Sequence, residues 1–431
     1  MTPEALAFVV FVAGMLVLMG IGMNMALALV LTGAGMAWVM DFWDTQLLAQ
    51  NLVAGVDSFP LLAVPFFILA GELMNSGGIS RRIIDMAQAW VGHIRGGLGY
   101  VAIGAAVLMA SMSGSALADT AALATILLPM MRQQGYPMAT SAGLVASGGI
   151  IAPIIPPSMP FVIYGVTTNT SISALFISGI VPGLIMGVGL IFAWRYVLRD
   201  LSLPAGQPLP LRERLRATAK AFWALVMPII IIIGGMKTGV FTPTEAAVVA
   251  AFYALVVALF IHREMQVAEL GGVLVRAAKT TAIVMFLCAG AQVASYMITL
   301  ADLPSVLTGW LGPLVESPRL LMLVMMVTLV LIGTALDLTP TILIFAPVML
   351  PIAVKAGIDP VYFGLMFVLN GAIGLITPPV GTVLNVVAGV GRLSLHQVIK
   401  GVNPFLVTYT AILALFVAFP QIVTAPVAWM R

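Results

Sequence analysis

Charged side chains are scarce in this sequence. Of its 431 residues, 8% are Asp, Glu, Lys or Arg and 61% are hydrophobic, whereas about a quarter of the residues of an ordinary soluble domain are charged. So few charges cannot solvate the surface of a globular protein of this size. Several apolar runs approach the roughly 20 residues that a helix needs to cross a bilayer, so the sequence predicts an all-α protein with many membrane spans.

Cysteine is almost absent, because Cys288 is the single thiol. A disulfide framework and a cysteine-ligated metal site are therefore excluded. No basic residue precedes Arg81, so the apolar segment 5–22 lacks the positive region that opens a secretory signal peptide. We interpret this segment as a retained membrane span.

Nucleotide-binding and catalytic motifs are also missing. The sequence has no G-x-x-x-x-G-K-[ST] phosphate loop and no soluble segment long enough for a nucleotide domain, which argues against an ATP-driven pump. No constellation of His, Asp and Ser or of metal-binding histidines is visible, so we expect neither an enzyme nor a transition-metal site, and no cofactor.

The apolar runs that are present predict two kinds of membrane segment. The blocks 97–131 and 319–353 are too short for two full spans each, and both carry polar residues and glycine at the centre, "SMSGSALADT" and "GTALDLTPT". We interpret these two blocks as re-entrant helical hairpins. Ordinary spans are expected near residues 5–22, 24–40, 58–76, 138–169, 172–194, 221–238, 242–261, 280–300, 361–390 and 402–425.

The basic residues predict the topology, because lysine and arginine concentrate in cytoplasmic loops. If loop 77–96 is cytoplasmic, the acidic, base-free segment 41–58 and the N-terminus fall outside. The first hairpin then opens toward the cytoplasm and the second toward the outside. Basic residues left outside are Lys237, Arg319, Lys355 and Arg431.

The two halves of the chain repeat each other. Five spans separate the hairpins, so the second copy is inverted relative to the first, which is typical of secondary transporters. With a shift of 219 residues, Gly114, Ala116, Leu117 and Thr120 match Gly333, Ala335, Leu336 and Thr339. With a shift of 222, Gly135, Gly149, Ile151, Pro156, Pro157, Gly179 and Pro182 match Gly357, Gly371, Ile373, Pro378, Pro379, Gly401 and Pro404.

Each half contains two expected helix breaks, a hairpin tip and a diproline loop, "IIPPS" or "LITPPVGT". Proline removes a backbone donor, and backbone groups freed at membrane depth must face a cavity or the protein interior. Freed carbonyls suit a small cation, and the N-termini of half-helices attract an anion. The alternative is that the prolines only kink long spans for packing, but two pairs in register, each with a polar tip, favour an ion site.

Four acids lie in apolar segments and are functional candidates. Asp119 and Asp337 stand beside the hairpin tips, where a sodium or network role and a helix-capping role are both open. Glu245 follows Thr242 by three residues, a spacing that favours a capping box. For Glu72 we favour a polar contact between helices over an ion relay.

A basic amphipathic stretch follows the third span. "ISRRIIDMAQAWVGHIRGG" places Arg81, Arg82 and Arg95 around apolar positions, a pattern that predicts a helix lying flat on the cytoplasmic face. It fits an arm that joins a scaffold to a moving domain, and it fits a plain topology anchor equally well.

Long motifs carry a family resemblance. "LLAVPFFILAGELMNSGGISRRI", "SGSALADTAA", "GGIIAPIIPPSMPFVIYG", "FTPTEAAVVAAFYAL", "LDLTPTILIFAPVMLP" and "GLITPPVGTVLNV" strongly resemble the large membrane subunit of tripartite ATP-independent periplasmic (TRAP) transporters, essentially end to end. The chain is most similar to permeases for sugar acids of the 2,3-diketogulonate type, and C4-dicarboxylate permeases share most of these motifs.

The resemblance implies a sodium-coupled elevator importer with inverted repeats, two re-entrant hairpins and two broken helices. It also implies two partners, a small four-helix membrane subunit and a periplasmic solute-binding protein that delivers an organic acid. A self-sufficient sodium/dicarboxylate symporter of the same architecture is the alternative, and it needs no binding protein. A channel is disfavoured, since inverted broken helices favour alternating access.

Residue roles follow from motif position within the resemblance. No arginine falls in the four breaks, so hydroxyls, backbone N–H groups and sodium charge are expected to hold the substrate anion. One sodium site is expected at Ser113, Gly114, Ser115, Pro156 and Ser158, and the other at Gly333, Thr334, Asp337, Thr377 and Gly381. The substrate carboxylate is expected near Ser115, Pro157, Thr339 and Asn385.

The expected organisation alternates scaffold and transport segments. Residues 1–57 are assigned to N-terminal scaffold helices, 58–96 to a scaffold span and the amphipathic arm, 97–200 to the first transport repeat, 201–318 to scaffold spans and a second arm, 319–401 to the second transport repeat, and 402–431 to a C-terminal span.

Overall fold

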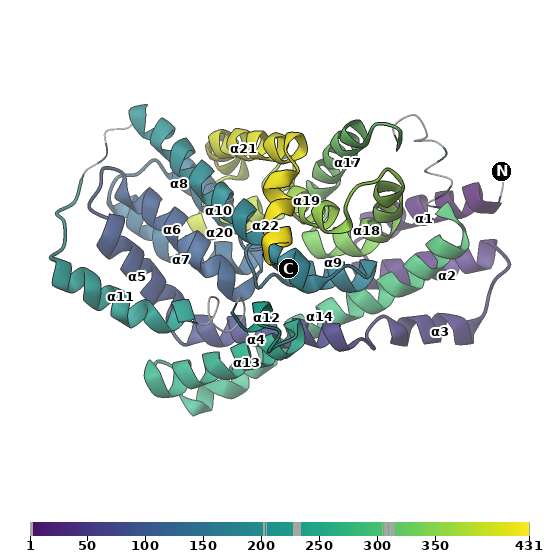
Figure 1. Ribbon diagram of the computed structural model, residues 1–431, viewed down its shortest axis with the longest axis horizontal. Helices are drawn as coiled ribbons and strands as arrows, with labels where there is room; N and C mark the ends of the chain where they lie inside the picture. Colours follow the sequence, from purple (N-terminus) through teal and green to yellow (C-terminus); the bar gives the residue numbers. More distant parts are fainter. Residues whose placement is uncertain are drawn as a thin grey trace.

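The computed structural model describes residues 3–200, 203, 205–226, 234–303, 305, 309 and 315–430. Its regular elements over these ranges are helices (Figure 1). Part of the span expected near 221–238 lies outside the described residues, as do Arg431 and the side chain of Lys237.

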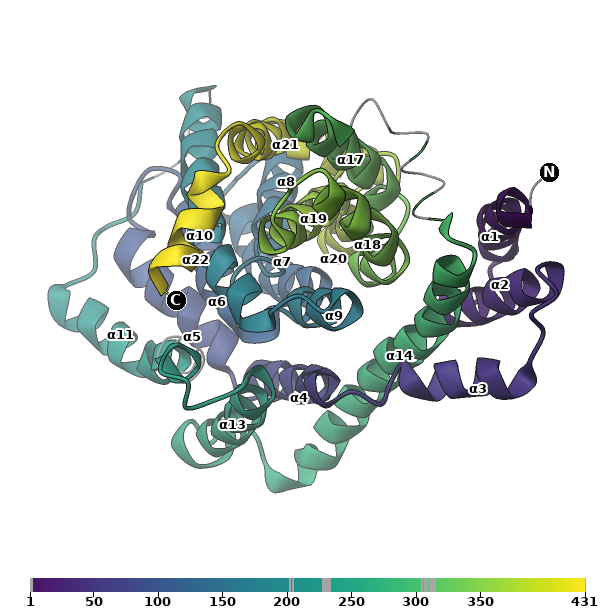
Figure 2. The same cartoon turned by 45° about the vertical axis from the view of Figure 1, so that its right-hand side comes forward.

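Helices from the start and the middle of the chain form one flank of the molecule, beside a bundle built from residues 97–197 and 318–418 (Figure 2). In this flank α14 packs against α2, α3 and α4, and α13 packs against α4. The flank contains α1 (Pro3–Gly20), α2 (Met25–Val39), α3 (Thr45–Ala54), η1 (Phe59–Leu62), α4 (Ala63–Ser76), α13 (Pro243–Val256), η4 (Val257–Ile261) and α14 (Val267–Leu300).

The bundle consists of two equivalent series of helices. The first is α6 (Gly97–Ser113), α7 (Ala116–Gln133), α8 (Met138–Gly149), α9 (Met159–Thr168) and α10 (Ile172–Val197). The second is α17 (Pro318–Gly333), α18 (Leu338–Lys355), α19 (Pro360–Gly374), α20 (Thr382–Gly391) and α21 (Leu395–Ala418). Both expected hairpins and both expected interruptions at the diprolines are therefore present.

Contacts within the bundle follow the repeat. In each series the hairpin packs against the half-helix that follows it, so α6 and α7 contact α8 while α17 and α18 contact α19. Across the series, α9 packs on α18 as α20 packs on α7, and α10 packs on α19 as α21 packs on α8. Exchanging the two series leaves this pattern unchanged, which is the mark of a twofold-related internal repeat.

The two hairpins open at opposite ends of α21. Just after the first hairpin, the carbonyl oxygen of Ala139 lies 1.8 Å from where a Cβ on Gly401 would be, near the start of α21. Just after the second hairpin, the hydroxyl of Tyr362 donates a hydrogen bond of 3.0 Å to the carbonyl of Phe416, near the end of α21. The second repeat is thus inverted relative to the first, as the spacing of the spans predicts.

The crossing of α8 and α21 is unusually close. A Cβ on Gly143 would lie 2.3 Å from the carbonyl carbon of Gly401, so only glycine fits at the crossing. Farther along, the buried hydroxyl of Tyr409 donates a hydrogen bond of 2.7 Å to the carbonyl of Ser147. Backbone contact and this hydrogen bond together fix the first repeat to the second.

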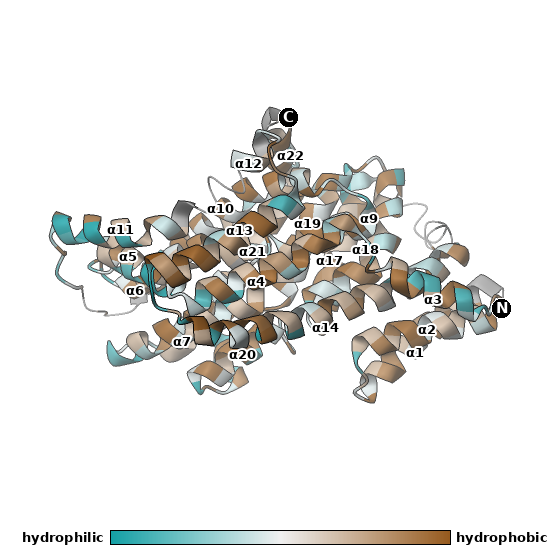
Figure 3. Cartoon of the chain, turned by 90° about the horizontal axis from the view of Figure 1, so that it is seen from below, coloured by the Kyte–Doolittle hydropathy of each residue, from teal (hydrophilic) through white to brown (hydrophobic). Residues whose placement is uncertain are grey.

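Helix lengths agree with a membrane protein containing half-spans. A ten-residue helix such as α9 or α20 is about 15 Å long, roughly half the thickness of the hydrocarbon core. Figure 3 shows hydrophilic residues near the outer end of α11 (Leu211–Val226) and near α3, with mostly hydrophobic helices between them. Six described helices are long and apolar enough to cross a membrane: Phe59–Ser76, Ile172–Val197, Pro243–Ile261, Val267–Leu300, Leu338–Lys355 and Leu395–Ala418.

Two segments differ from the expected spans. The acidic segment after α2 contains helix α3, which begins where Asp44 accepts hydrogen bonds from the amides of Gln46 and Leu47. The single span expected at 402–425 is two helices, because α21 ends at Ala418, before Pro420, and α22 (Gln421–Met430) follows.

Candidate functional site

In the first repeat, the hairpin tip lies directly on the diproline loop. The tip turns at Gly114, whose φ of +61° is the left-handed conformation that glycine adopts without strain. A Cβ on Gly114 would lie 2.7 Å from the carbonyl oxygen of Pro157 and 3.0 Å from the Cα of Ser158. Backbone atoms of the tip and of the loop are therefore in contact, as the motif positions predict.

Side chains of this first pair are arranged around two helix N-termini. Ser115 is the N-cap of α7, and Ser158 is the N-cap of α9. The buried hydroxyl of Ser158 donates to the carbonyl of Pro153 and accepts from the amide of Phe161. Since an sp³ hydroxyl oxygen has two lone pairs, one remains to coordinate a cation. Ser113 is the last residue of α6, and its side chain lies outside the described part of the chain.

In the second repeat, the tip and the diproline loop are joined by a hydrogen bond. The amide of Gly381 donates to the carbonyl of Thr334 over 3.1 Å. Close to it, a Cβ on Gly374 would lie 2.6 Å from the Cα of Gly333, so the two helices meet backbone to backbone. The structure thus brings Gly333, Thr334 and Gly381 together.

The second tip is longer than the first. Four residues, Thr334 to Asp337, separate α17 from α18, whereas two separate α6 from α7. Asp337 occupies the N-cap position of α18, and its carboxyl group interacts with the backbone of Leu338 but forms no capping hydrogen bond further into the helix. Its carbonyl accepts hydrogen bonds from the amide and the hydroxyl of Thr341, at 3.2 and 2.8 Å. The position of Asp337 leaves the sodium or network role open.

The two diproline loops differ in exposure. Pro156, Pro157 and Ser158 are buried, whereas Pro379 and Asn385 are exposed. Thr377 is half-buried, and its hydroxyl donates a hydrogen bond of 2.8 Å to the carbonyl of Ile373. The first diproline loop is therefore enclosed, whereas the second reaches the surface at Pro379, although Gly381 and Thr334 beside it are buried.

The four expected substrate residues come from different elements. Ser115 and Thr339 lie at the starts of α7 and α18, the return helices of opposite hairpins, and both are half-buried. Pro157 is buried beneath the first tip. Asn385 lies on the exposed face of α20, with its amide nitrogen 3.2 Å from the carbonyl of Val380. The described contacts do not join these four side chains into one cluster.

Two polar residues beside the breaks were given no site role by the sequence analysis. Asn370 is fully buried in α19 and donates to the carbonyl of Met366 over 2.6 Å, and its Oδ1 has no hydrogen-bond partner among the described residues. The buried Oγ1 of Thr120, which lies against Gly149, likewise has no hydrogen-bond partner among the described residues. Because buried polar atoms nearly always have partners, both oxygens are available to a water or an ion. A lone Asn in the run "VYFGLMFVLNGAIGLI" was the available signal for Asn370.

The remaining membrane acids have structural partners. The carboxylate of Glu72 on α4 accepts a hydrogen bond of 2.9 Å from Nε of Arg276 on α14, which confirms the expected contact between helices. Glu245 and Thr242 form the expected capping box at the start of α13.

Comparison with known proteins identifies the family. Residues 12–422 match the family model described as the DctM component of the tripartite ATP-independent periplasmic transporter. The chain belongs to this family. Its relatives are named as transporter permeases, so this DctM-family chain is a membrane transport protein and not an enzyme.

Relatives of known name extend over nearly the whole chain. The 2,3-diketo-L-gulonate TRAP transporter large permease protein YiaN of Escherichia coli is 52% identical, over 99% of this chain and 100% of its own length. The C4-dicarboxylate TRAP transporter large permease protein DctM of Pseudomonas aeruginosa is 41% identical, over 89% of this chain and 90% of its own. The sialic acid TRAP transporter large permease protein SiaM of Vibrio cholerae is 38% identical, over 95% of each chain.

A solved structure shares the fold. The YdaH transporter of Alcanivorax borkumensis, whose crystal structure reveals an unusual topology, aligns with a TM-score of 0.61 at 16% identity. The alignment covers 88% of this chain and 90% of the YdaH chain.

Proposed function

We propose that this chain is the large permease subunit of a sodium-coupled importer of an organic acid. A small four-helix membrane subunit and a periplasmic binding protein would complete the transporter, in keeping with the tripartite name of the family. The identity of 52% to a 2,3-diketo-L-gulonate permease, against 41% to a C4-dicarboxylate permease, favours a sugar acid over a dicarboxylate.

The observation that carries this proposal is the contact between tip and loop in both repeats. Gly114 lies on Pro157 and Ser158, and Thr334 accepts a hydrogen bond from Gly381. In each pair a hairpin end and a helix break would supply carbonyl and hydroxyl oxygens at membrane depth. Oxygens of this kind are ligands for a hard cation such as sodium.

Bound sodium would hold the substrate acid in turn. Each break is followed by a helix N-terminus, of α7, α9, α18 or α20, and helix N-termini favour anions. Two sodium ions between such termini would add positive charge and order the tips. This arrangement would couple cation and acid without an arginine. The motif positions put the carboxylate near Ser115, Pro157, Thr339 and Asn385.

An elevator movement fits the division of the chain. The flank of α1–α4, α13 and α14 would remain fixed in the membrane as the scaffold, while the two repeats carry the substrate across. The amphipathic helix α5 (Ile79–Val91), between α4 and α6, would be the connecting arm. The proposed setting is a bacterial inner membrane with the N-terminus in the periplasm.

Reconstitution in liposomes tests the proposal. Uptake of radiolabelled 2,3-diketogulonate or succinate is expected only when this chain, the small subunit and the loaded binding protein are all present with an inward sodium gradient. Replacing the sodium gradient by a potassium gradient is the control for coupling. Sodium-driven uptake by this chain alone would establish the self-sufficient symporter in place of the tripartite transporter.

A further inference from the structure

A basic pocket lies where α5, α11 and the end of η4 meet, and none of its residues belongs to the four helix breaks. Its volume is about 410 Å³. The charged and titratable residues that line it are Arg81, Arg82, Asp85, Lys220, His262 and Glu264, and Gly78, Ala219, Trp223 and Ile261 complete the wall.

The charges of this pocket do not cancel. Arg82 forms an ion pair of 2.7 Å with Glu264 and donates to the carbonyl of Gly78 over 3.0 Å, so both members of this pair are engaged. Arg81 and Lys220 are exposed and form no ion pair with any described residue, and Asp85 is the single further acid of the pocket. An excess of positive charge is therefore available to an anion.

His262 adds no charge at neutral pH. Burial of the ring and the positive charge of Arg82 lower its pKa from the usual value of 6.5, although the carbonyl of Gly77 and the charge of Glu264 act in the opposite direction. The ring thus remains neutral on the pocket wall, and the anion would be recognised by Arg81 and Lys220.

The pocket lies where charged residues give way to exposed apolar ones on two helices. On α11, the basic residues end at Lys220, and Phe222 and Trp223 follow with 53% and 37% of their surface exposed. At the end of η4, the exposed Phe260 and Ile261 are followed directly by His262 and by charged residues. Such a change from aromatic to basic residues marks the level of the lipid headgroups.

We propose that this pocket binds the headgroup of an anionic phospholipid. The lipid phosphate would lie between Arg81 and Lys220, and the glycerol and the first acyl carbons would contact Trp223 and Ile261. Basic pockets between membrane helices on the cytoplasmic side suit such headgroups. The lipid would join α5 to α11, so it would stabilise the position of the proposed arm. This inference requires neither sodium coupling nor a particular substrate.

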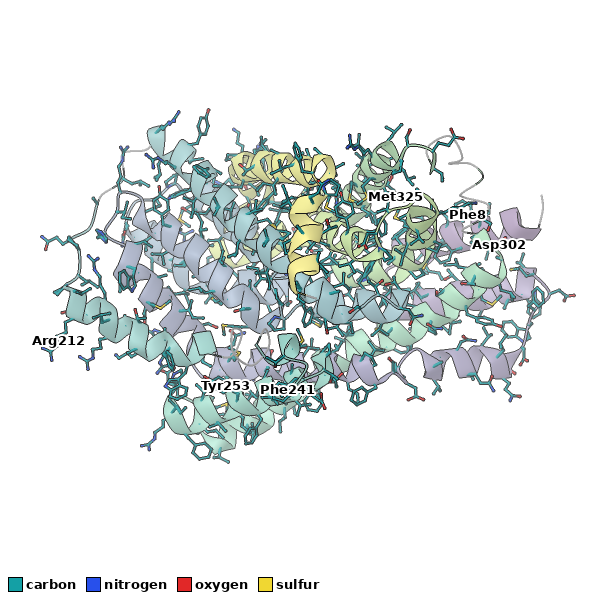
Figure 4. The ribbon with its side chains drawn as sticks, viewed as in Figure 1. Phe8, Arg212, Phe241, Tyr253, Asp302 and Met325 are labelled. Carbon is teal, nitrogen blue, oxygen red and sulfur yellow. The ribbon has the colours of Figure 1, made fainter. Side chains whose placement is uncertain are left out.

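Native mass spectrometry of the purified full-length protein tests the site with phosphatidylglycerol as the probe. The double variant Arg81→Gln/Lys220→Gln is expected to weaken retention of one phosphatidylglycerol by about 30-fold. Arg212→Gln/Arg216→Gln is the matched control, since it removes the same charge from α11 outside the pocket. Figure 4 shows Arg212 at the outer end of α11, pointing away from the other helices.

Three further measurements distinguish binding of the anionic lipid from binding of other ligands. Phosphatidylcholine has no net charge, so the unmodified protein and the double variant are expected to retain it equally. Equal losses in the two double variants would overturn the site, because the effect would then be general surface charge. Displacement of the lipid by millimolar inorganic phosphate would also overturn it, because the pocket would then take a free anion. Gel filtration and circular dichroism verify that both variants are folded.

Discussion

The amide of Gly381 donates a hydrogen bond to the carbonyl of Thr334, so the diproline loop of the second repeat is attached to the hairpin tip that it faces. Gly381 itself has a φ of +52°, a backbone conformation that glycine adopts without strain. A side chain at this position would meet both a leucine methyl group and the carbonyl of Leu375, at 2.9 and 3.0 Å. The second ion-site candidate depends on this glycine.

Gly381→Ala is therefore expected to raise the sodium concentration for half-maximal uptake by about tenfold, because a left-handed conformation costs a non-glycine residue 1–2 kcal/mol, about what a tenfold change requires. Gly389→Ala is the control on the same helix, since nothing lies within 4 Å of its added Cβ. Uptake is measured in liposomes at varied sodium. An unchanged sodium dependence in Gly381→Ala would remove this loop from the site.

Hydroxyl groups at the two breaks are expected to contribute to sodium affinity. Ser115→Ala and Thr377→Ala should each lower the apparent sodium affinity severalfold, while the amount of protein in the membrane stays close to normal. The first change removes only a hydroxyl oxygen, and the second removes a hydroxyl and one methyl group. Thr125→Ala is the control for Ser115, because Thr125 is an exposed residue of the same helix. Sodium titration of uptake and quantitative immunoblotting measure the two effects. If both variants titrate like the unmodified protein, the ligand assignment is wrong.

Glu72 is expected to stabilise the scaffold and to take no part in ion transfer. Its partner Arg276 also donates a hydrogen bond to Ser76 over 3.1 Å. Because this ion pair is partly exposed, Glu72→Gln should cost at most about 1 kcal/mol of folding free energy and leave the sodium dependence intact. A double-mutant cycle with Arg276→Gln, read by thermal unfolding, measures the pair. If Glu72→Gln lost sodium coupling while its stability stayed normal, Glu72 would instead act as an ion relay.

Protonation of His262 is expected to lower the stability of the folded protein in acid. Its pKa in the folded protein lies below 6.5, mainly because the ring is buried and beside Arg82. The neutral ring contributes fully above pH 6.5, and this contribution is lost as the pH falls through the lower pKa of the folded state. His262→Gln should therefore flatten the decline in melting temperature between pH 7.5 and 5.5, relative to the unmodified protein. His396→Gln, at an exposed site, should leave the decline unchanged; an equal effect of both variants would contradict the assignment.

The proposed topology can be tested by labelling single cysteines. After Cys288→Ala, Asp44→Cys should react with a membrane-impermeant maleimide added to intact cells, because it lies in the acidic segment between α2 and α3. Arg212→Cys should react only after the membrane is opened. The reverse labelling pattern would place the N-terminus in the cytoplasm and would make the first hairpin open toward the outside.

Local chemistry made most of the bundle predictable. Proline and glycine act on the backbone at their own positions, so the breaks at Pro156 and Pro378 could be located without tertiary information. Inversion of the repeat followed from the number of spans between the hairpins. The capping box at Thr242 was likewise readable, because both of its partners lie within one helical turn.

Features that depend on distant contacts could not be predicted in the same way. Helix α3 was missed because its ten residues are too few for a membrane span, and the segment 41–58 was interpreted only as an acidic loop. The contact between Gly374 and Gly333 joins residues of different helices, and nothing local indicates which glycines meet. The pairing of Glu72 with Arg276 was expected in kind, but its partner could not be named from the sequence.

The crossing of Gly143 and Gly401 has a mechanical consequence. The main chains of α8 and α21 touch there, and Tyr409 joins the same two helices by a hydrogen bond a few residues farther along. Neither repeat can slide past the other without breaking these contacts. A displacement of one repeat would therefore displace the other by the same amount.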